Sequence, residues 1–240
     1  MGRRGVVEEE AAYVLHRRPY RETSLLVDLF ARGAGRIRAV ARGGRRTPAA
    51  GQPFVQLAVA WSGRSSLKTL TRAEPMVPLA PLPAGRELYL GLYLNELLLR
   101  LLPEADPHPR LYEHYRAVLA ALPGGVHPEP LLRRFELALL AELGYGFELE
   151  CTAGGQPLAG EGCYRFVPGV GLVAAAAGSG GDLLQGRHLL AMAAEDYRDP
   201  EVCRCAKRLT RTALAEHLGP RPLRSRELFR KAVPGRRRPA

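Results

Sequence analysis

The sequence lacks the residue patterns that mark a metal site or a hydrolase. Its 240 residues include four cysteines, and none of them forms the C-x-x-C pairs that structural zinc sites usually use. The G-x-S-x-G, H-E-x-x-H and P-loop motifs are also absent. Six histidines are scattered along the chain without an evident catalytic partner. We therefore expect no enzymatic activity, no cofactor and no bound metal, and we interpret the cysteines as reduced thiols.

Long apolar runs are missing as well. The N-terminal stretch MGRRGVVEEEAAYVL lacks the hydrophobic region of a secretory signal. The longest apolar run, Leu88–Leu102, is shorter than the roughly 20 residues of a membrane span and contains Asn95, Glu96 and Arg100. These features predict a cytoplasmic protein with no membrane partner, in which this run is a buried amphipathic helix.

Acidic residues are scarce at both ends of the chain. The formal net charge is +11, with 35 basic and 24 acidic residues. Residues 1–72 carry a net charge of +9, residues 73–150 of −5 and residues 151–240 of +7. GC-rich coding would explain the preference for arginine over lysine, but it does not explain the net charge. The charge favours a polyanionic partner, which means nucleic acid, an anionic membrane surface or an acidic protein.

Short β-prone segments fill the first 75 residues. Turn residues such as Gly33-Ala34-Gly35 and Gly43-Gly44 separate them. The five expected strands are Ala11–Arg17, Ser24–Phe30, Arg36–Arg42, Phe54–Trp61 and Ser66–Glu74. Five strands in so short a segment predict a small closed barrel, because closure removes exposed sheet edges.

Helical patterns dominate the rest of the chain. Apolar residues recur every three or four positions from about Leu88 to Leu102, and further helices fit Pro109–Leu122 and Glu129–Leu143. Glycines then interrupt the chain around a predicted hairpin, Cys163–Val167 with Gly171–Ala175. Helices resume at Leu183–Ala194, Pro200–Leu218 and Ser225–Val233. The fold class is α+β, with proposed domains at 1–75 (barrel), 76–150 (central helical bundle) and 151–240 (the hairpin with basic helices packing on the bundle).

The third expected strand and the loop after it are rich in arginine. Arg36 and Arg38 are two residues apart and share one face of the strand, and no acidic residue interrupts the run to Arg46. Such a surface would neutralise phosphates and gain from counterion release. The predicted nucleic-acid track comprises Arg36, Arg38, Arg42, Arg45 and Arg46, with Arg64 and Lys68 beside it. A solvated charged face is the alternative for any single arginine of the set.

Four aromatic residues accompany this track as candidates for base stacking. They are Tyr13, Tyr20, Phe54 and Trp61. The alternative is that Phe54 and Trp61 belong to the core, which we favour for Trp61.

A second basic stripe is predicted on the Pro200–Leu218 helix. Arg204, Lys207, Arg208 and Arg211 recur at spacings of three and four, which places them on one helix face. Like charges at these spacings repel, so an anionic ligand or nearby acidic side chains would relieve the repulsion. An ordinary solvated face remains the alternative to a second DNA track.

Several ordered segments of the chain resemble the bacterial recombination mediator RecO family. Residues 12–46 carry the R-P-Y-x-E-T-S-L step and the G-R-x-R-x-V-A-x-G strand. LYLGLYLNELLLRLL resembles the family's first long helix, EPLLRRFELALLAELGYGFELE its bundle helix, and AKRLTRTALAEHLGPRPLRSRELF its C-terminal signature. The resemblance extends from about residue 11 to residue 233.

The resemblance implies an N-terminal OB-fold and a function without catalysis. Members of the family bind single- and double-stranded DNA and anneal complementary strands. With the partner RecR they help RecA replace single-stranded-DNA-binding protein (SSB) on gapped DNA, and SSB is engaged through its C-terminal tail. A functional link to RecA is therefore expected, with dependence on RecF left open. The expected location is the cytoplasm, in association with the nucleoid.

One departure from the family concerns zinc. Some members carry two cysteine pairs in the third segment, and Cys151 stands where the first ligand would be. The matching later positions are Gly154, Ala174 and Ala177, none of which can ligate a metal. The chain resembles the zinc-free branch, so the hairpin is expected to be a degenerate zinc ribbon.

The SSB tail, acidic with an apolar free-carboxylate end, requires a cation beside an apolar pocket. Arg133 and Arg134, next to Phe135 and Leu139, supply these elements in an otherwise acidic segment. The alternative is that the two arginines pair with Glu129, Glu136 or Glu142 along the helix.

Two other classes of protein compete with the mediator. An RNA-binding OB-fold factor would share the basic strand but would not explain the match in the helical segments. An enzyme would require a nucleophile, an acid–base pair or a metal site that the sequence does not assemble.

Overall fold

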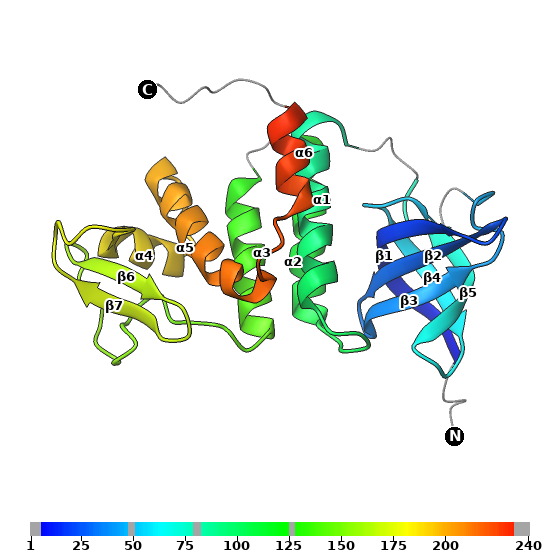
Figure 1. Ribbon diagram of the computed structural model, residues 1–240, viewed down its shortest axis with the longest axis horizontal. Helices are drawn as coiled ribbons and strands as arrows, with labels where there is room; N and C mark the ends of the chain where they lie inside the picture. The colour runs from blue at the N-terminus through cyan, green and yellow to red at the C-terminus, as the bar shows by residue number, and fades with distance from the viewer. Residues whose placement is uncertain (1–5, 48–50, 79–82, 125–127, 233–240) are drawn as a thin grey trace. The chain divides into compact units, whose positions relative to one another are not determined.

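The computed structural model describes residues 6–47, 51–78, 83–124 and 128–232 (Figure 1). Contacts divide the chain into two compact units. The first comprises Met1–Gly125 with Arg221–Ala240, and the second comprises Val126–Pro220. The proposed division at residues 75 and 150 stays a prediction, and the contacts group the elements differently.

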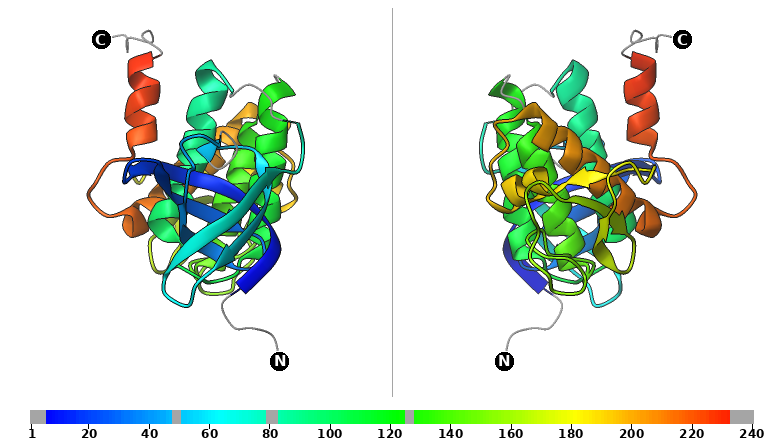
Figure 2. Two further views of the ribbon diagram at one scale, coloured as in Figure 1. Left: turned by 90° about the vertical axis from the view of Figure 1, so that its right-hand side faces the viewer. Right: turned by 90° about the vertical axis from the view of Figure 1, so that its left-hand side faces the viewer.

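Five strands form a closed barrel in the first unit, as the sequence predicts. They are β1 (Val6–Tyr20), β2 (Ser24–Ala31), β3 (Gly35–Ala41), β4 (Gln56–Ser62) and β5 (Leu67–Pro75). The order around the barrel is β1-β2-β3-β5-β4, and β4 pairs with β1 to close it. All pairings are antiparallel except that of β3 with β5. The left-hand view of Figure 2 shows β1, in dark blue, curving across the barrel.

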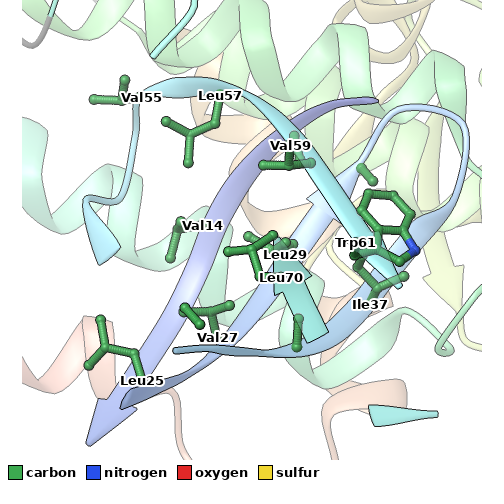
Figure 3. Packing of buried hydrophobic residues seen from close by; sticks show 14 residues of the cluster. Val14, Leu25, Val27, Leu29, Ile37, Val55, Leu57, Val59, Trp61 and Leu70 are labelled. Atoms are coloured by element: carbon green, nitrogen blue, oxygen red, sulfur yellow. The ribbon is translucent and has the colours of Figure 1, made fainter. Parts of the chain in front are cut away.

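Small and branched apolar side chains fill the barrel. Burial alternates strictly along β3, where Ile37, Ala39 and Ala41 point inward and Arg36 and Arg38 are partly exposed on the other face. Figure 3 shows Trp61 among these inward side chains, close to Ile37, and it is only 4% exposed. Trp61 is therefore a core residue, as we favoured, and not a stacking platform.

Helices α1 (Gly85–Leu101) and α2 (Pro109–Ala121) pack on the outside of the barrel, and a short 3-10 turn, η2 (Leu122–Gly124), follows. Tyr13 and Phe30 of the barrel meet Tyr112 and Tyr115 of α2 in an aromatic cluster, with ring centroids 5.1–6.0 Å apart. Buried Asn95 links the parts, because its Nδ2 donates to the Leu15 carbonyl at 2.9 Å and its Oδ1 accepts from the Tyr115 hydroxyl at 2.6 Å. A buried amide whose N–H and C=O groups both have hydrogen-bond partners stabilises one arrangement of α1, α2 and β1.

The last helix, α6 (Arg224–Ala232), returns to the first unit and packs against α1 (Figure 1). Glu96 of α1 accepts hydrogen bonds from the backbone N–H groups of Arg224 and Ser225, both at 2.9 Å, and from the Ser225 hydroxyl at 2.7 Å. A carboxylate at a helix N-terminus satisfies free N–H donors and complements the helix dipole. Tyr89 also meets Phe229 edge to face at 5.9 Å.

The second unit contains α3 (Glu129–Glu142), a small sheet and two further helices. The sheet has the order β7-β6-β8, with β6 (Cys163–Val167), β7 (Gly171–Ala175) and β8 (Leu184–Gln185). Helices α4 (Gly186–Ala193) and α5 (Pro200–Leu218) follow, and the right-hand view of Figure 2 shows the sheet with these helices. Asp199 caps α5 by accepting from the Glu201 N–H at 2.8 Å, which explains the start of the helix at Pro200.

The predicted α+β class is confirmed. The expected helix Leu183–Ala194 is wrong at its start, because Leu184–Gln185 forms β8 beside β6 and the helix begins only at Gly186. The bounds of β6, β7 and α5 coincide with those expected from the sequence. The expected final helix ended at Val233, which lies outside the described residues.

Candidate nucleic-acid interface

The outward arginines of β3 are held in an ionic network. The Arg38 Nε lies 3.3 Å from an oxygen of Asp28, directly opposite on β2, and its Nη2 lies 3.1 Å from Glu104. The Arg36 Nη1 lies 3.8 Å from Asp28 and 3.7 Å from Glu104, and its Nε donates to the Leu102 carbonyl at 2.9 Å. Two arginines and two carboxylates therefore neutralise one another on this face.

The loop from α1 to α2 supplies half of this network. Its backbone runs beside β3, where the Ala105 N–H donates to the Arg36 carbonyl at 2.8 Å. Gly35 has a φ of +70°, and a Cβ there would lie 1.8 Å from the Asp106 carbonyl oxygen. Only glycine allows so close an approach. The loop thus covers part of the face of β3 that the sequence offered to nucleic acid. The Arg36 side chain keeps only 14% exposure, and that of Arg38 keeps 41%.

The exposed basic surface lies at the end of the barrel where β1 and β3 finish. The loop after β3 is tied to the β1–β2 turn, because the Arg45 N–H donates to the Thr23 carbonyl at 3.1 Å. This contact brings together exposed arginines from both segments. We call them the barrel-end cluster: Arg17, Arg18, Arg21, Arg42, Arg45 and Arg46.

The barrel-end cluster has almost no compensating charge. Within the described residues, none of its six guanidinium groups forms an ion pair with a carboxylate. Glu22 is the acidic residue within its two segments, 17–23 and 42–47. Adjacent cations raise the local potential and attract polyanions. An anionic backbone laid across this end would relieve the repulsion among them.

Sequence reasoning identified Arg42, Arg45 and Arg46 of this cluster and missed Arg17, Arg18 and Arg21. The hairpin between the first two strands carries the missing signal. A turn at Tyr20–Thr23 places the end of β1 beside the start of β2, next to the exit of β3. Pairing β1 with β2 and β2 with β3 from this turn would have predicted that residues 17–21 lie beside residues 42–46.

Arg64 and Lys68 belong to the β4–β5 hairpin. Lys68 lies beside Ala39 of β3 in the parallel pairing, and its Nζ donates to the Gly63 carbonyl at 3.2 Å. Arg42 is three residues beyond Ala39, or roughly 10 Å along a strand. Lys68 therefore lies away from the cluster. Arg64, exposed at the hairpin tip, lies farther still, because the hairpin precedes Leu67, which pairs with Arg38, and follows Ser62, which pairs with Val6 at the start of β1.

Of the four aromatic candidates, the structure leaves one at the cluster. Tyr13 is 4% exposed within the α2 contact, and burial raises its pKa to about 12. Phe54 packs its ring against Gly91 of α1. Tyr20 is partly exposed in the β1–β2 turn, with the Arg21 guanidinium 5.3 Å from its ring centroid.

The predicted stripe on α5 lies on the exposed side of that helix. Arg204, Arg208 and Arg211 are exposed and Lys207 is half-buried. Arg204 forms a two-pronged ion pair with Glu201, and Arg208 donates to the Leu183 carbonyl at 3.2 Å. The stripe is therefore partly neutralised, and its role in DNA binding stays a prediction.

Arg133, the first cation of the predicted tail site, is buried. Its Nη1 lies 2.6 Å from the Glu136 carboxylate and 3.3 Å from the Thr210 hydroxyl of α5. Phe135 and Leu139 are 0% exposed. The alternative of an ion pair along the helix is thus what the structure shows for Arg133, and three of the four residues offer no surface to a peptide.

Arg134 faces an open cleft of the second unit. The cleft holds about 660 Å³ and is lined by Pro130, Arg134, Ala194, Glu195, Asp196, Tyr197 and Arg198. Arg134 pairs with Glu195 at 3.1 Å and lies 5.8 Å from the Tyr197 ring centroid. Hydrogen bonds from Arg198 lower the pKa of Asp196 to about 2, and burial raises that of Tyr197 to about 12. The cleft therefore combines cations, anions and an apolar wall.

Metal ligands do not gather in the described part of the chain. No group of three histidine, cysteine or acidic side chains is placed to hold an ion there. Cys151 forms an isolated β-bridge with Pro157, and Cys163 lies opposite Ala175 on β6. The absence of a metal and of catalysis stays a prediction. None of the helices searched in the described residues is long and apolar enough to cross a membrane.

Comparisons with known proteins agree on one family. Residues 6–78 match the model described as Recombination protein O N terminal, and residues 83–227 match Recombination protein O C terminal. A "DNA repair protein RecO" of Pseudomonas aeruginosa (strain UCBPP-PA14) is 50% identical over 221 residues, which cover 92% of this chain and 94% of that protein. Proteins of the same name from Stutzerimonas stutzeri (strain A1501) and Yersinia pestis (strain Pestoides F) are 51% and 47% identical. Those matches cover 92% and 93% of this chain and 92% and 95% of theirs.

Proposed function

Because the chain belongs to the RecO family of DNA repair proteins, we propose that it binds DNA through the barrel-end cluster and acts as a non-catalytic recombination mediator. In this role it binds single and double strands, anneals complementary strands and, with RecR, helps RecA replace SSB. The RNA-binding alternative has no support from the helical segments, which match the same family as the barrel.

The observation that carries the proposal is the set of six exposed arginines that have no carboxylate partner among the described residues. Paired arginines such as Arg36 and Arg38 already have their charge compensated, so they gain little from a phosphate. Unpaired arginines gain a charge-assisted hydrogen bond and release counterions from the nucleic acid. The barrel-end cluster is therefore the part of the barrel where phosphates bind most favourably.

Annealing follows from the presence of a second basic surface. Two complementary strands repel each other through their phosphates, and a protein that screens both lowers this barrier. We assign the first strand to the barrel-end cluster and the second to the exposed face of α5, with Arg204, Lys207, Arg208 and Arg211. Arg64 and Lys68 of the β4–β5 hairpin lie toward the other end of the barrel, where we propose a separate phosphate contact.

The partners follow from the family rather than from a contact in this chain. The SSB tail is proposed to bind at the cleft beside Arg134, whose partly exposed guanidinium would exchange its exposed partner Glu195 for an acidic residue of the tail, while Tyr197 offers a wall to the apolar end. Arg133, Phe135 and Leu139 would support that wall from inside. The proposed location is the cytoplasm, in association with the nucleoid.

The test is the triple change Arg42→Glu, Arg45→Glu and Arg46→Glu. We expect the dissociation constant for a single-stranded oligonucleotide to rise about tenfold or more, because three phosphate contacts become repulsive. The slope of log affinity against log salt should become shallower by about 2, at roughly 0.7 for each lost contact. Fluorescence anisotropy over a salt series measures both quantities.

A matched control keeps the change of charge and moves it elsewhere. Arg110→Glu, Arg187→Glu and Arg221→Glu reverse three exposed arginines outside the cluster and outside the α5 stripe. This control variant should keep more of the affinity for the oligonucleotide, and more of the salt slope, than the variant with Arg42, Arg45 and Arg46 reversed. Equal losses in the two variants would mean that only net charge matters, and the proposed site would be rejected. Tighter binding of RNA than of DNA of equal length would favour the alternative.

Annealing of dye-labelled complementary strands extends the test to the mediator role. The wild-type protein should accelerate annealing of bare and of SSB-coated strands, and the triple variant should lose both effects. Acceleration of bare strands alone would leave DNA binding in place and remove the proposed tail contact. No acceleration even with RecR present would refute the mediator function.

A further inference from the structure

The β1–β2 turn inside the barrel-end cluster holds an aromatic ring and a strained residue side by side. Arg21 has a φ of 52°, a left-handed conformation that side chains other than glycine rarely adopt. Its guanidinium lies 5.3 Å from the centroid of the Tyr20 ring. Backbone strain of this kind persists where the surrounding structure enforces it and often marks functional sites.

Other aromatic rings of the barrel are buried or, in the case of partly exposed Phe54, packed against a helix. Tyr13, Phe30 and Trp61 are at most 4% exposed, and Phe54 packs on Gly91 of α1. Among the described barrel residues, Tyr20 alone combines a partly exposed ring with a place among unpaired arginines. The contact recorded over its ring comes from Arg21, an exposed side chain with no carboxylate partner among the described residues.

We propose that Tyr20 is a stacking platform for an unpaired nucleobase and makes the barrel end selective for single-stranded nucleic acid. The inference rests on the proposed function, because it requires a nucleic-acid backbone at the barrel-end cluster. Arg21 holds the ring in the free protein and moves to a phosphate when a base takes its place. An exposed cation–π contact is weaker than a base stacked on an aromatic ring, so this exchange favours binding.

Selectivity follows from what each ligand can offer. Both single strands and duplexes present phosphates, so the arginines of the cluster bind both. Bases inside a duplex are already stacked on one another and cannot place a face on Tyr20 without unpairing, which costs free energy. Tyr20 therefore strengthens the binding of single strands alone, whereas Arg42, Arg45 and Arg46 serve both ligands.

The experiment compares three substitutions of Tyr20 on three ligands. The ligands are an oligothymidylate, a blunt duplex of equal length and a single strand with abasic sites throughout. We expect Tyr20→Ala and Tyr20→Leu to weaken oligothymidylate binding about tenfold, since one stacked base is lost, and to leave duplex and abasic binding unchanged. Tyr20→Phe keeps the ring and should bind all three as the wild type does.

Two controls keep structural effects apart from stacking. Tyr20→Leu preserves apolar bulk, so a fold that needs only packing survives in it. Arg21→Gly accepts the left-handed backbone without strain, leaves Tyr20 in place and removes one cation. It should weaken all three ligands by a similar small factor while preserving the preference for bases.

The outcomes separate the inference from the function on which it rests. If Tyr20→Ala weakens all three ligands equally, or weakens none, the stacking platform is refuted. If the triple reversal of Arg42, Arg45 and Arg46 also has no effect, the proposed DNA site itself fails. A loss confined to the base-bearing single strand, with rescue by Tyr20→Phe, supports the inference.

Discussion

Replacing Arg133 by alanine should destabilise the second unit far more than any change to its exposed arginines. The Arg133 side chain is 8% exposed and that of Glu136 is 1% exposed, with 2.6 Å between them. The Thr210 hydroxyl of α5 donates to the same Glu136 oxygen. Without Arg133, the Glu136 carboxylate would lose the guanidinium that lies 2.6 Å from it, in an interior with little access to water.

The expected cost is about 3–5 kcal/mol, the range for removing one partner of a buried ion pair. Most of this cost comes from the carboxylate left behind, not from the attraction that is lost. A typical domain is stable by about 5–15 kcal/mol, so the variant should remain folded but unfold at a much lower denaturant concentration. Replacing both members, as in Arg133→Met with Glu136→Leu, should cost much less because no charge remains buried.

Urea unfolding followed by circular dichroism measures the change in the free energy of unfolding. Arg134→Ala is the matched control. The Arg134 side chain follows Arg133 in the same helix, is 33% exposed and pairs with the exposed Glu195. Such a surface pair contributes about 0–1 kcal/mol. If Arg133→Ala costs no more than Arg134→Ala, or if the double replacement is as damaging as the single one, the buried-charge argument is wrong.

Two further predictions concern the first unit. Glu96→Gln should weaken the docking of α6 by about 1–2 kcal/mol, since the amide keeps one acceptor for the N–H donors of Arg224 and Ser225; hydrogen exchange should quicken in α6 and not in the barrel, and unchanged α6 exchange would disprove the capping role. Burial raises the pKa of Tyr13 to about 12 from a usual 10. Because this tyrosine ionises first in the unfolded chain, its contribution to the free energy of unfolding is complete below pH 10 and is lost between pH 10 and pH 12. Over these two pH units the loss of unfolding free energy is at most about 2.7 kcal/mol. Tyr13→Phe should therefore reduce the fall of the urea midpoint between pH 10 and pH 12. The reduction should be partial, because burial also raises the pKa values of the two α2 tyrosines beside Tyr13.

Local pattern sufficed for most elements because their ends carry local signals. Helix α5 begins at Pro200 after the Asp199 cap and ends before Gly219, and turn residues bound β6 and β7. Strand β1 is one exception, since it begins at Val6 and not at Ala11. Its charged start, Glu8–Glu10, lacks the pattern of a strand, and tertiary pairing with β4 overrides that local preference.

Long-range partners explain what the sequence could not predict. No local signal tells that α6 returns to Glu96, more than a hundred residues earlier. The alternation along β3 correctly placed Arg36 and Arg38 on one face, and hairpin register would have set Asp28 opposite Arg38. The second carboxylate, Glu104, comes from the loop after α1, so the neutralisation of this face required the tertiary structure.

The distribution of acidic residues explains why the surplus charge of the barrel collects at one end. Asp28 is shared by two arginines of β3, and Glu9 and Glu74 both contact Arg72. Glu10 accepts from the Gly33 N–H at 2.8 Å. These carboxylates lie along the strands, whereas the barrel-end segments contribute six arginines against Glu22. Since the strand acids are committed where they lie, the proposed DNA backbone would supply the negative charge that compensates the barrel-end cluster.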